Sequence, residues 1–136
     1  MRAINYIAVH CSATPQTAKV SSIQKYWKEN LGWKNPGYHV IVEADGNAVE
    51  LLPIEQVSNG VGGYNSHIIN ISYIGGVDAA GNPKDTRTCA QKETILKYLK
   101  KWKAMFPNAK IQGHRDFPNV KKACPSFDAK KEYQNV

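Results

Sequence analysis

Residues 113–127, GHRDFPNVKKACPSF, carry the groups around which the rest of the chain is organised. Within them, His114 and Cys124 flank a short loop, and Lys122 precedes the cysteine by two residues. Imidazole and thiolate groups are ligands that zinc prefers, and a lysine this close can act on a group that the metal activates. The segment therefore indicates a metal site that the remainder of the chain must complete.

A third candidate ligand, His10, ends an upstream segment that is typical of a strand. Residues 4–10 alternate in polarity and are rich in β-forming residues. With His114 and Cys124, His10 would give three ligands, and a catalytic zinc site keeps its fourth position for water. Cys11 is a competing thiol, but the residue after His10 on a strand should point to the opposite face. Taken singly, a strand-end histidine is more often a hydrogen-bonded structural residue, and a lone cysteine a small buried hydrophobe.

Apolar residues at helical spacing predict two longer helices. Ser21 or Ser22 can cap the first and Thr86 or Thr88 the second, because hydroxyl oxygens accept hydrogen bonds from free backbone N–H groups. The expected helical ranges are 23–30, about 86–105, and a short terminal range at 127–133.

Strand patterns lie between these helices. A turn signal at residues 45–47 separates two of them and predicts a hairpin, and the apolar, β-branched run at 68–77 predicts a buried central strand. The expected strands are 4–10, 38–43, 48–52, 68–77 and 110–114. This order predicts an α/β fold with a single mixed β-sheet flanked by helices.

The composition is that of one globular domain covering residues 1–136, with 42% hydrophobic residues. No apolar run approaches the ~20 residues needed to cross a bilayer, so membrane insertion is not expected. The N-terminal segment lacks the long apolar region of a signal peptide, which predicts synthesis in the cytoplasm without an export signal. Three cysteines, an odd number, argue against a disulfide framework.

The formal net charge is +7, and lysines crowd the last third of the chain. A basic surface attracts polyanions such as nucleic acid, anionic lipid or acidic cell-wall polymer, but a solvated face that keeps the protein soluble explains it equally well. No helix-turn-helix, zinc-finger or RNA-binding signature is present, so nucleic-acid binding is not expected.

Five motifs follow one another along nearly the whole chain. They are His10-Cys11-Ser12-Ala13-Thr14, Gly37-Tyr38-His39, Gly63-Tyr64-Asn65, Gly75-Gly76-Val77-Asp78 and Lys122-Ala123-Cys124-Pro125-Ser126-Phe127-Asp128. Together they resemble the zinc-dependent N-acetylmuramoyl-L-alanine amidases, above all phage lysozymes of the amidase type, which are related to the peptidoglycan recognition proteins. The first and last motifs are specific, whereas the glycine pairs are not.

The resemblance implies a role for each matching residue. His10, His114 and Cys124 match the family's Zn²⁺ ligands, Tyr38 matches the tyrosine beside the zinc-bound water, and Lys122 matches the lysine that steadies the oxyanion. The implied reaction is hydrolysis of the amide between N-acetylmuramic acid and L-alanine in peptidoglycan. The expected partner is therefore a muramyl peptide, bound by a monomeric enzyme.

Other assignments are less direct. Tyr64, Asn65 and His67 are expected to contact the substrate. Tyr38 alone would be explained as a packing residue at a strand edge, and Lys121 is an immediate rival of Lys122. His39 follows Tyr38, should face the other way and is expected to be structural.

The chain departs from the family pattern at several positions. Gly60-Val61 stands near a histidine of many members, Ser72 near a glutamate of some, and Asn70 in place of a strand glycine. The loop from His114 to Cys124 is slightly longer. These departures leave the ligand set intact and bear on substrate binding.

The biological setting is open at this point. The expected enzyme is a phage or prophage lysin released through a separate pore, an effector delivered by other machinery, or a cytoplasmic enzyme that recycles wall fragments. The alternative is a non-catalytic peptidoglycan-binding or RNA-polymerase-regulating module on the same fold. Cys124 favours catalysis, because members that bind without cutting have lost this ligand.

Overall fold

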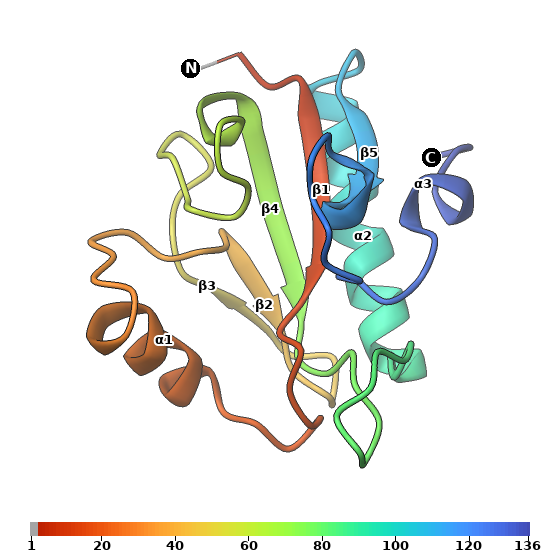
Figure 1. Cartoon of the computed structure of the whole chain (residues 1–136). Helices are drawn as coiled ribbons and strands as arrows, with labels where there is room; N and C mark the ends of the chain where they lie inside the picture. Colours follow the sequence, from red (N-terminus) through yellow and green to blue (C-terminus); the bar gives the residue numbers. More distant parts are fainter. Residues whose placement is uncertain (1–2) are drawn as a thin grey trace.

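A mixed sheet lies at the centre of the computed structural model, which describes residues 3–136. Met1 and Arg2, at the start of the segment considered for an export signal, lie outside the described residues. Within that range the sheet has five strands in the order β3-β2-β4-β1-β5 (Figure 1). The strands are β1 (Tyr6–Cys11), β2 (Val40–Val42), β3 (Ala48–Glu50), β4 (Ile68–Tyr73) and β5 (Lys110–Gly113).

The strand directions confirm the predicted fold class. β4 pairs in parallel with β1 and β2, β1 pairs in parallel with β5, and β2 and β3 form the predicted antiparallel hairpin. β4, fully buried along its length, is the central strand, although it ends at Tyr73 rather than at residue 77.

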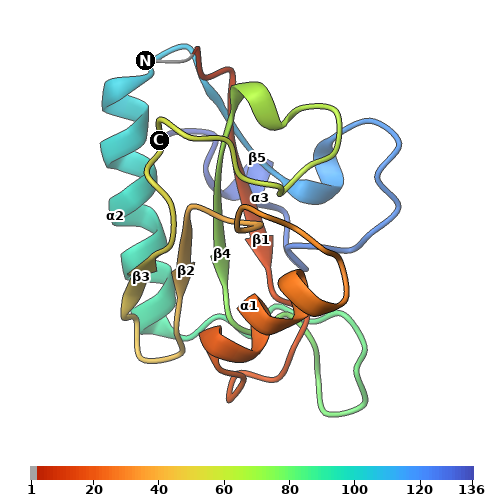
Figure 2. The same ribbon diagram turned by 90° about the vertical axis from the view of Figure 1, so that its left-hand side faces the viewer.

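Helices cover both faces of this sheet. They are α1 (Val20–Glu29), α2 (Cys89–Met105), α3 (Ala129–Glu132) and the short 3₁₀ turns η1 (Asn65–His67) and η2 (His114–Asp116). Figures 1 and 2 show α2 on one face, called the α2 face below, and α1 on the other, called the α1 face. Among residues 3–136, no helix is both long and apolar enough to cross a bilayer.

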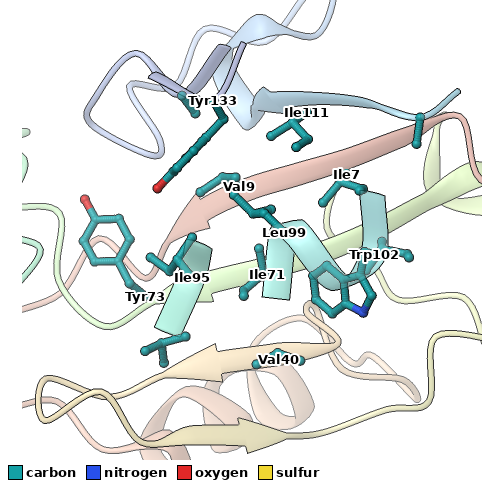
Figure 3. Packing of buried hydrophobic residues seen from close by; sticks show 14 of the residues in the cluster. Ile7, Val9, Val40, Ile71, Tyr73, Ile95, Leu99, Trp102, Ile111 and Tyr133 are labelled. Carbon is teal, nitrogen blue, oxygen red and sulfur yellow. The ribbon is translucent and has the colours of Figure 1, made fainter. Parts of the chain in front are cut away.

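The main core lies on the α2 face, because the apolar side of α2 meets the apolar residues of the strands there. Ile95, Leu99 and Trp102 lie on one side of α2 and are at most 2% exposed. They pack against every second residue of the strands below. Figure 3 shows this packing, with Ile7, Val9, Val40 and Ile71 contributed by the sheet. Full burial of each such side chain stabilises the fold by ~1.5–3 kcal/mol.

The first residues of α1 and α2 show how far local sequence signals determine where a helix begins. Thr88, one of the two threonines predicted as the cap, caps α2: its Oγ1 accepts the N–H of Gln91, and the Gln91 Oε1 accepts the N–H of Thr88. The serine cap predicted for α1 is wrong, because Lys19 stands at that position and makes no side-chain cap bond. Val20 is already helical and packs in the cluster that contains Trp27, so burial of the apolar side sets this helix start.

Arg87 joins the loop before α2 to the C-terminal helix. Its side chain is 1% exposed and forms ion pairs with Asp85 at 2.9 Å and Glu132 at 2.7 Å. It also donates to the Tyr133 hydroxyl at 2.9 Å and lies 3.4 Å from the centre of the Phe127 ring. Because Phe127 ends the segment that carries Cys124, this cluster anchors the loop of Cys124.

Arg87→Ala is expected to lower the free energy of unfolding by about 2–4 kcal/mol and the melting temperature by roughly 10 °C at pH 7. Burial alone would raise the pKa of Asp85, but the hydrogen bonds and charge of Arg87 hold it below its usual value, and Arg87 likewise lowers the pKa of Glu132. Depressed carboxyl pKa values stabilise the fold above the unfolded-state values of about 4, and this stabilisation is lost as the pH falls further.

The difference in melting temperature between wild type and Arg87→Ala should therefore shrink at pH 3. Lys130→Ala, an exposed cation on α3, serves as the control and should melt like wild type. Equal melting temperatures of wild type and Arg87→Ala at pH 7 would contradict the anchoring role.

Candidate metal centre

Two histidines meet because their strands are parallel neighbours. Val9 of β1 lies opposite Gly113 of β5, so the residues that follow, His10 and His114, emerge side by side at one edge of the sheet. Their ring centres are 4.8 Å apart. His10 is 1% exposed and His114 is half-buried. The carboxyl ends of parallel strands commonly carry such sites.

Cys124 reaches the histidines on a loop that is pinned at several points. The N–H of Cys11 donates to the Cys124 Sγ at 3.1 Å, and the N–H of Arg115 donates to the Cys124 carbonyl at 2.8 Å. The next residue, Pro125, packs so closely on β5 that a Cβ at Gly113 would lie 2.6 Å from its Cδ. Glycine at position 113 therefore allows the loop to approach the strand.

The three side chains fit a zinc ion. Their ligand atoms all lie within 4.8 Å of one another, and the Cys124 Sγ is 3.8 Å from the His10 Nδ1. Tetrahedral zinc with ordinary Zn–N and Zn–S bond lengths holds its ligand atoms about 3.3–3.6 Å apart, so a small contraction suffices. Two imidazoles and one thiolate suit zinc and leave one position open. Within residues 3–136 this group contains no carboxylate, and Ser72 lies beside His10 in the sheet.

Electrostatics keep both histidines ready to bind a metal. Burial and then the neighbouring His114 lower the pKa of His10 to about 3, and burial with the charge of Lys122 lowers the pKa of His114 to about 4. Both imidazoles are therefore neutral at pH 7. The Cys11 thiol and burial raise the pKa of Cys124 in the metal-free protein, so metal binding must release the proton of this thiol.

Cys11 follows the expected alternation. Its side chain is 4% exposed and packs in the α2-face core together with Val9 and Tyr73. The competing thiol is therefore outside the ligand group of the described residues, although its backbone N–H supports Cys124.

Tyr38 lies against the candidate metal site and also packs on Trp27. Its ring centre is 4.9 Å from that of His10 and 5.4 Å from that of Trp27 in α1. Its hydroxyl donates to the Cys11 carbonyl at 3.3 Å. Burial and the nearby Cys124 raise its pKa above the usual value, so the phenol stays protonated and can donate a hydrogen bond.

Lys122 faces the site from the loop before Cys124. Its side chain is exposed, and its positive charge contributes to the lowered pKa values of His10 and His114 and opposes the rise in the pKa of Cys124. It also lines a hollow of ≈ 570 Å³. Lys122, rather than Lys121, is thus the lysine that acts on the candidate ligands.

Sequence reasoning missed this hollow, which lies between α1 and the segment that follows β1. No sequence signal indicated it, because the 52% exposure of Tyr26 on α1 is a property of the folded chain. Together with Lys122, the lining residues are Ser12, Ala13, Thr14, Ala18, Ser22, Ile23, Tyr26 and Trp27.

The three residues expected to bind substrate lie elsewhere on the α1 face, before β4. Tyr64 packs against Phe117, with ring centres 5.2 Å apart. Asn65 accepts a backbone N–H at 2.7 Å within its own loop, and the His67 Nδ1 lies 3.1 Å from the Ala3 carbonyl oxygen. Their contact with substrate stays a prediction.

Three buried polar side chains behind His10 were also missed as part of the site. Asn70, Ser58 and His39 have no exposed surface and form a hydrogen-bonded chain that reaches the His10 ring. The sequence did hold a signal, because Asn70 is a polar residue in the middle of an apolar central strand, where polar side chains are uncommon.

Comparisons with known proteins identify the family of the chain. A family model described as N-acetylmuramoyl-L-alanine amidase matches residues 1–127. The endolysin of Klebsiella phage KP32 is 36% identical over 129 residues, which cover 94% of this chain and 84% of the relative.

Solved structures share the fold. The endolysin N-acetylmuramoyl-L-alanine amidase LysCS from Clostridium intestinale matches with a TM-score of 0.80 at 20% identity, over 98% of this chain and 84% of that one. The ectodomain complex of peptidoglycan recognition proteins LCa and LCx, bound to tracheal cytotoxin, matches with a TM-score of 0.80 at 22% identity, over 99% of this chain and 83% of that one. Since the family model covers nearly the whole chain, the protein belongs to the N-acetylmuramoyl-L-alanine amidase family of peptidoglycan hydrolases.

Proposed function

We propose that this protein is a zinc-dependent amidase that hydrolyses the bond between the lactyl group of N-acetylmuramic acid and L-alanine in peptidoglycan. The observation that carries the proposal is the convergence of His10, His114 and Cys124 beside Tyr38 and Lys122. A metal-binding group, a protonated phenol and an ammonium at one open edge of the sheet suit hydrolysis of an amide.

When bound by the three ligands, Zn²⁺ supplies a Lewis acid for the scissile carbonyl and lowers the pKa of water to ~7. Lys122 places a positive charge where the carbonyl oxygen becomes negative during attack. Tyr38 donates a hydrogen bond from its hydroxyl, which burial keeps protonated. The hollow beside Lys122 holds the adjoining part of the muramyl peptide.

We extend the proposal to the setting of the enzyme. The chain acts as one monomeric catalytic domain over residues 1–136, without membrane insertion. It reaches the cell wall after release or delivery, as a lysin does. Soluble wall fragments are the alternative substrate.

Tyr38→Phe is expected to lower the turnover number about 10- to 100-fold and to leave the zinc content unchanged. The phenyl ring keeps the packing on Trp27 but removes the donor beside the metal site. Turnover on purified peptidoglycan and zinc content per chain are measured together. Unchanged turnover would reduce Tyr38 to a packing residue.

The proposed reaction is tested by the release of L-alanine amino termini from purified peptidoglycan, with and without a chelator, on protein of known zinc content. Chelator-sensitive release with about one zinc per chain is expected. Bound zinc without release would favour a recognition or regulatory module. Protein that takes up no zinc would overturn the proposed metal centre.

A further inference from the structure

A chain of four buried polar side chains runs from the metal site into the α1 face of the sheet. The His10 Nε2 lies 2.7 Å from the Asn70 Oδ1, and the Asn70 Nδ2 lies 2.6 Å from the Ser58 Oγ. The Ser58 Oγ lies 3.2 Å from the Nδ1 of His39. All four residues are at most 1% exposed. Buried polar groups of this kind are held in one arrangement by their partners.

The direction of these hydrogen bonds can be deduced by starting from His39, the end of the chain farthest from the metal site. The backbone N–H of Asn70 donates to the His39 Nδ1 at 3.0 Å, so this nitrogen is an acceptor and carries no proton. The His39 proton is therefore on Nε2, which donates to the Gln56 carbonyl at 2.7 Å. His39 is thus a neutral ring in a single tautomer.

The next two bonds follow from this tautomer. The His39 Nδ1 carries no proton, so in its contact with this nitrogen the Ser58 hydroxyl can only be the donor, alongside the Asn70 N–H. This bond uses the one proton of the Ser58 hydroxyl. The hydroxyl must then accept from Asn70, which turns the Asn70 NH₂ group towards Ser58 and the Asn70 Oδ1 towards His10. The His10 Nε2 is consequently the protonated nitrogen, and the His10 Nδ1 lone pair is left on the side of Cys124.

Gly60 makes room for this arrangement. A Cβ at position 60 would lie 2.4 Å from both the Cγ and the Oδ1 of Asn70. The amide is therefore enclosed between Gly60 and His10.

We propose that Asn70, oriented by Ser58 and His39, is a positioning residue that fixes His10 in the tautomer able to bind zinc through Nδ1. The inference rests on the metal centre of the proposed function. Partners that hold the second nitrogen of a ligand histidine typically contribute 10- to 100-fold to metal affinity. Here the partner is a neutral amide, and its own orientation comes from a second histidine that does not reach the metal group.

The first test is zinc affinity, measured by competition with a chromophoric chelator. Asn70→Leu, which keeps the size but not the acceptor, should weaken zinc binding about 10- to 100-fold. Asn70→Asp should restore it to within about threefold of wild type, because one carboxylate oxygen can accept from His10. The other can accept from Ser58 once the Ser58 hydroxyl turns away from His39, whose Nδ1 still accepts the backbone N–H of residue 70. Ile69→Val, on the same strand but on the α2 face, is the matched control and should bind like wild type. Wild-type affinity in Asn70→Leu would overturn the inference.

The second test is independent of zinc and of turnover. In the metal-free protein, ¹H–¹⁵N correlation spectra should show the His10 proton on Nε2 in wild type and a mixture of tautomers in Ser58→Ala, which keeps Asn70 but frees its amide to turn. A proton on Nδ1 in wild type would refute the inference. If Asn70 controls zinc affinity but no L-alanine termini are released, the proposed function fails and the inference stands.

Discussion

Cys124→Ala is expected to lower zinc affinity by at least about 100-fold and to abolish amide hydrolysis. The change removes the only anionic donor of the three, and loss of a direct ligand should cost more than the 10- to 100-fold typical of an outer partner. The fold should persist, because the loss of the bond from the Cys11 N–H to the sulfur leaves two other restraints on the loop. The N–H of Arg115 still donates to the carbonyl of residue 124, and Pro125 still packs on Gly113. Zinc content after dialysis and release of L-alanine termini are the two measurements.

Cys11→Ala is the matched control for this experiment. Cys11 is the other cysteine beside Cys124, but its side chain packs in the α2-face core. It supports Cys124 through its backbone N–H, which alanine retains. It should keep zinc and activity and lose only a little stability from the missing sulfur atom. Equal zinc loss in the two variants would show that the ligand has been assigned to the wrong cysteine.

Lys122→Ala is expected to lower the turnover number about 100-fold while the zinc content stays at the wild-type level. Its ammonium stabilises negative charge on the carbonyl oxygen only as the transition state forms, so removing it should affect turnover more than substrate binding. We expect a smaller loss of turnover than the largest losses seen when an oxyanion-stabilising group is removed, because Lys122 is exposed to solvent in the free protein. Steady-state kinetics on solubilised peptidoglycan separate the two quantities.

Lys121→Ala controls for the loss of one positive charge in the same loop. Both lysines are exposed, but Lys122 is the one that lines the hollow and acts on the ligands. Lys121→Ala should therefore behave nearly like wild type. A large loss in Lys121→Ala with little change in Lys122→Ala would transfer the catalytic role to Lys121.

The fold followed closely from local patterns. The buried run around β4, the turn between β2 and β3, and the Thr88 cap were all predicted with their correct types. Errors fell at element ends, as at α1, where the packing of Val20 and Trp27 outweighs a hydroxyl cap. The ends of the strands also differ from the predicted ones, because pairing with a neighbouring strand decides how far a strand extends.

The candidate site was predicted in part. The grouping of His10, His114 and Cys124 was expected, and the structure places all three together. The choice between Lys121 and Lys122 rested on a motif, and the catalytic role of Lys122 stays a prediction, although Lys122 lines the hollow and its charge lowers the pKa of His114. The hollow beside α1 could not be foreseen, because its walls come from separate segments whose side chains are unremarkable in sequence.

The sequence by itself determined the sheet, the order of its elements and the three residues able to bind a metal, because periodicity, turn chemistry and ligand type are local properties. Only the tertiary structure decided which nitrogen of His10 is free to bind. That choice passes through Asn70, which is 60 positions away along the chain, and then through Ser58 and His39. A tautomer is set by which donor meets which acceptor in the folded interior, and contacts between such distant segments exist only once the chain has folded.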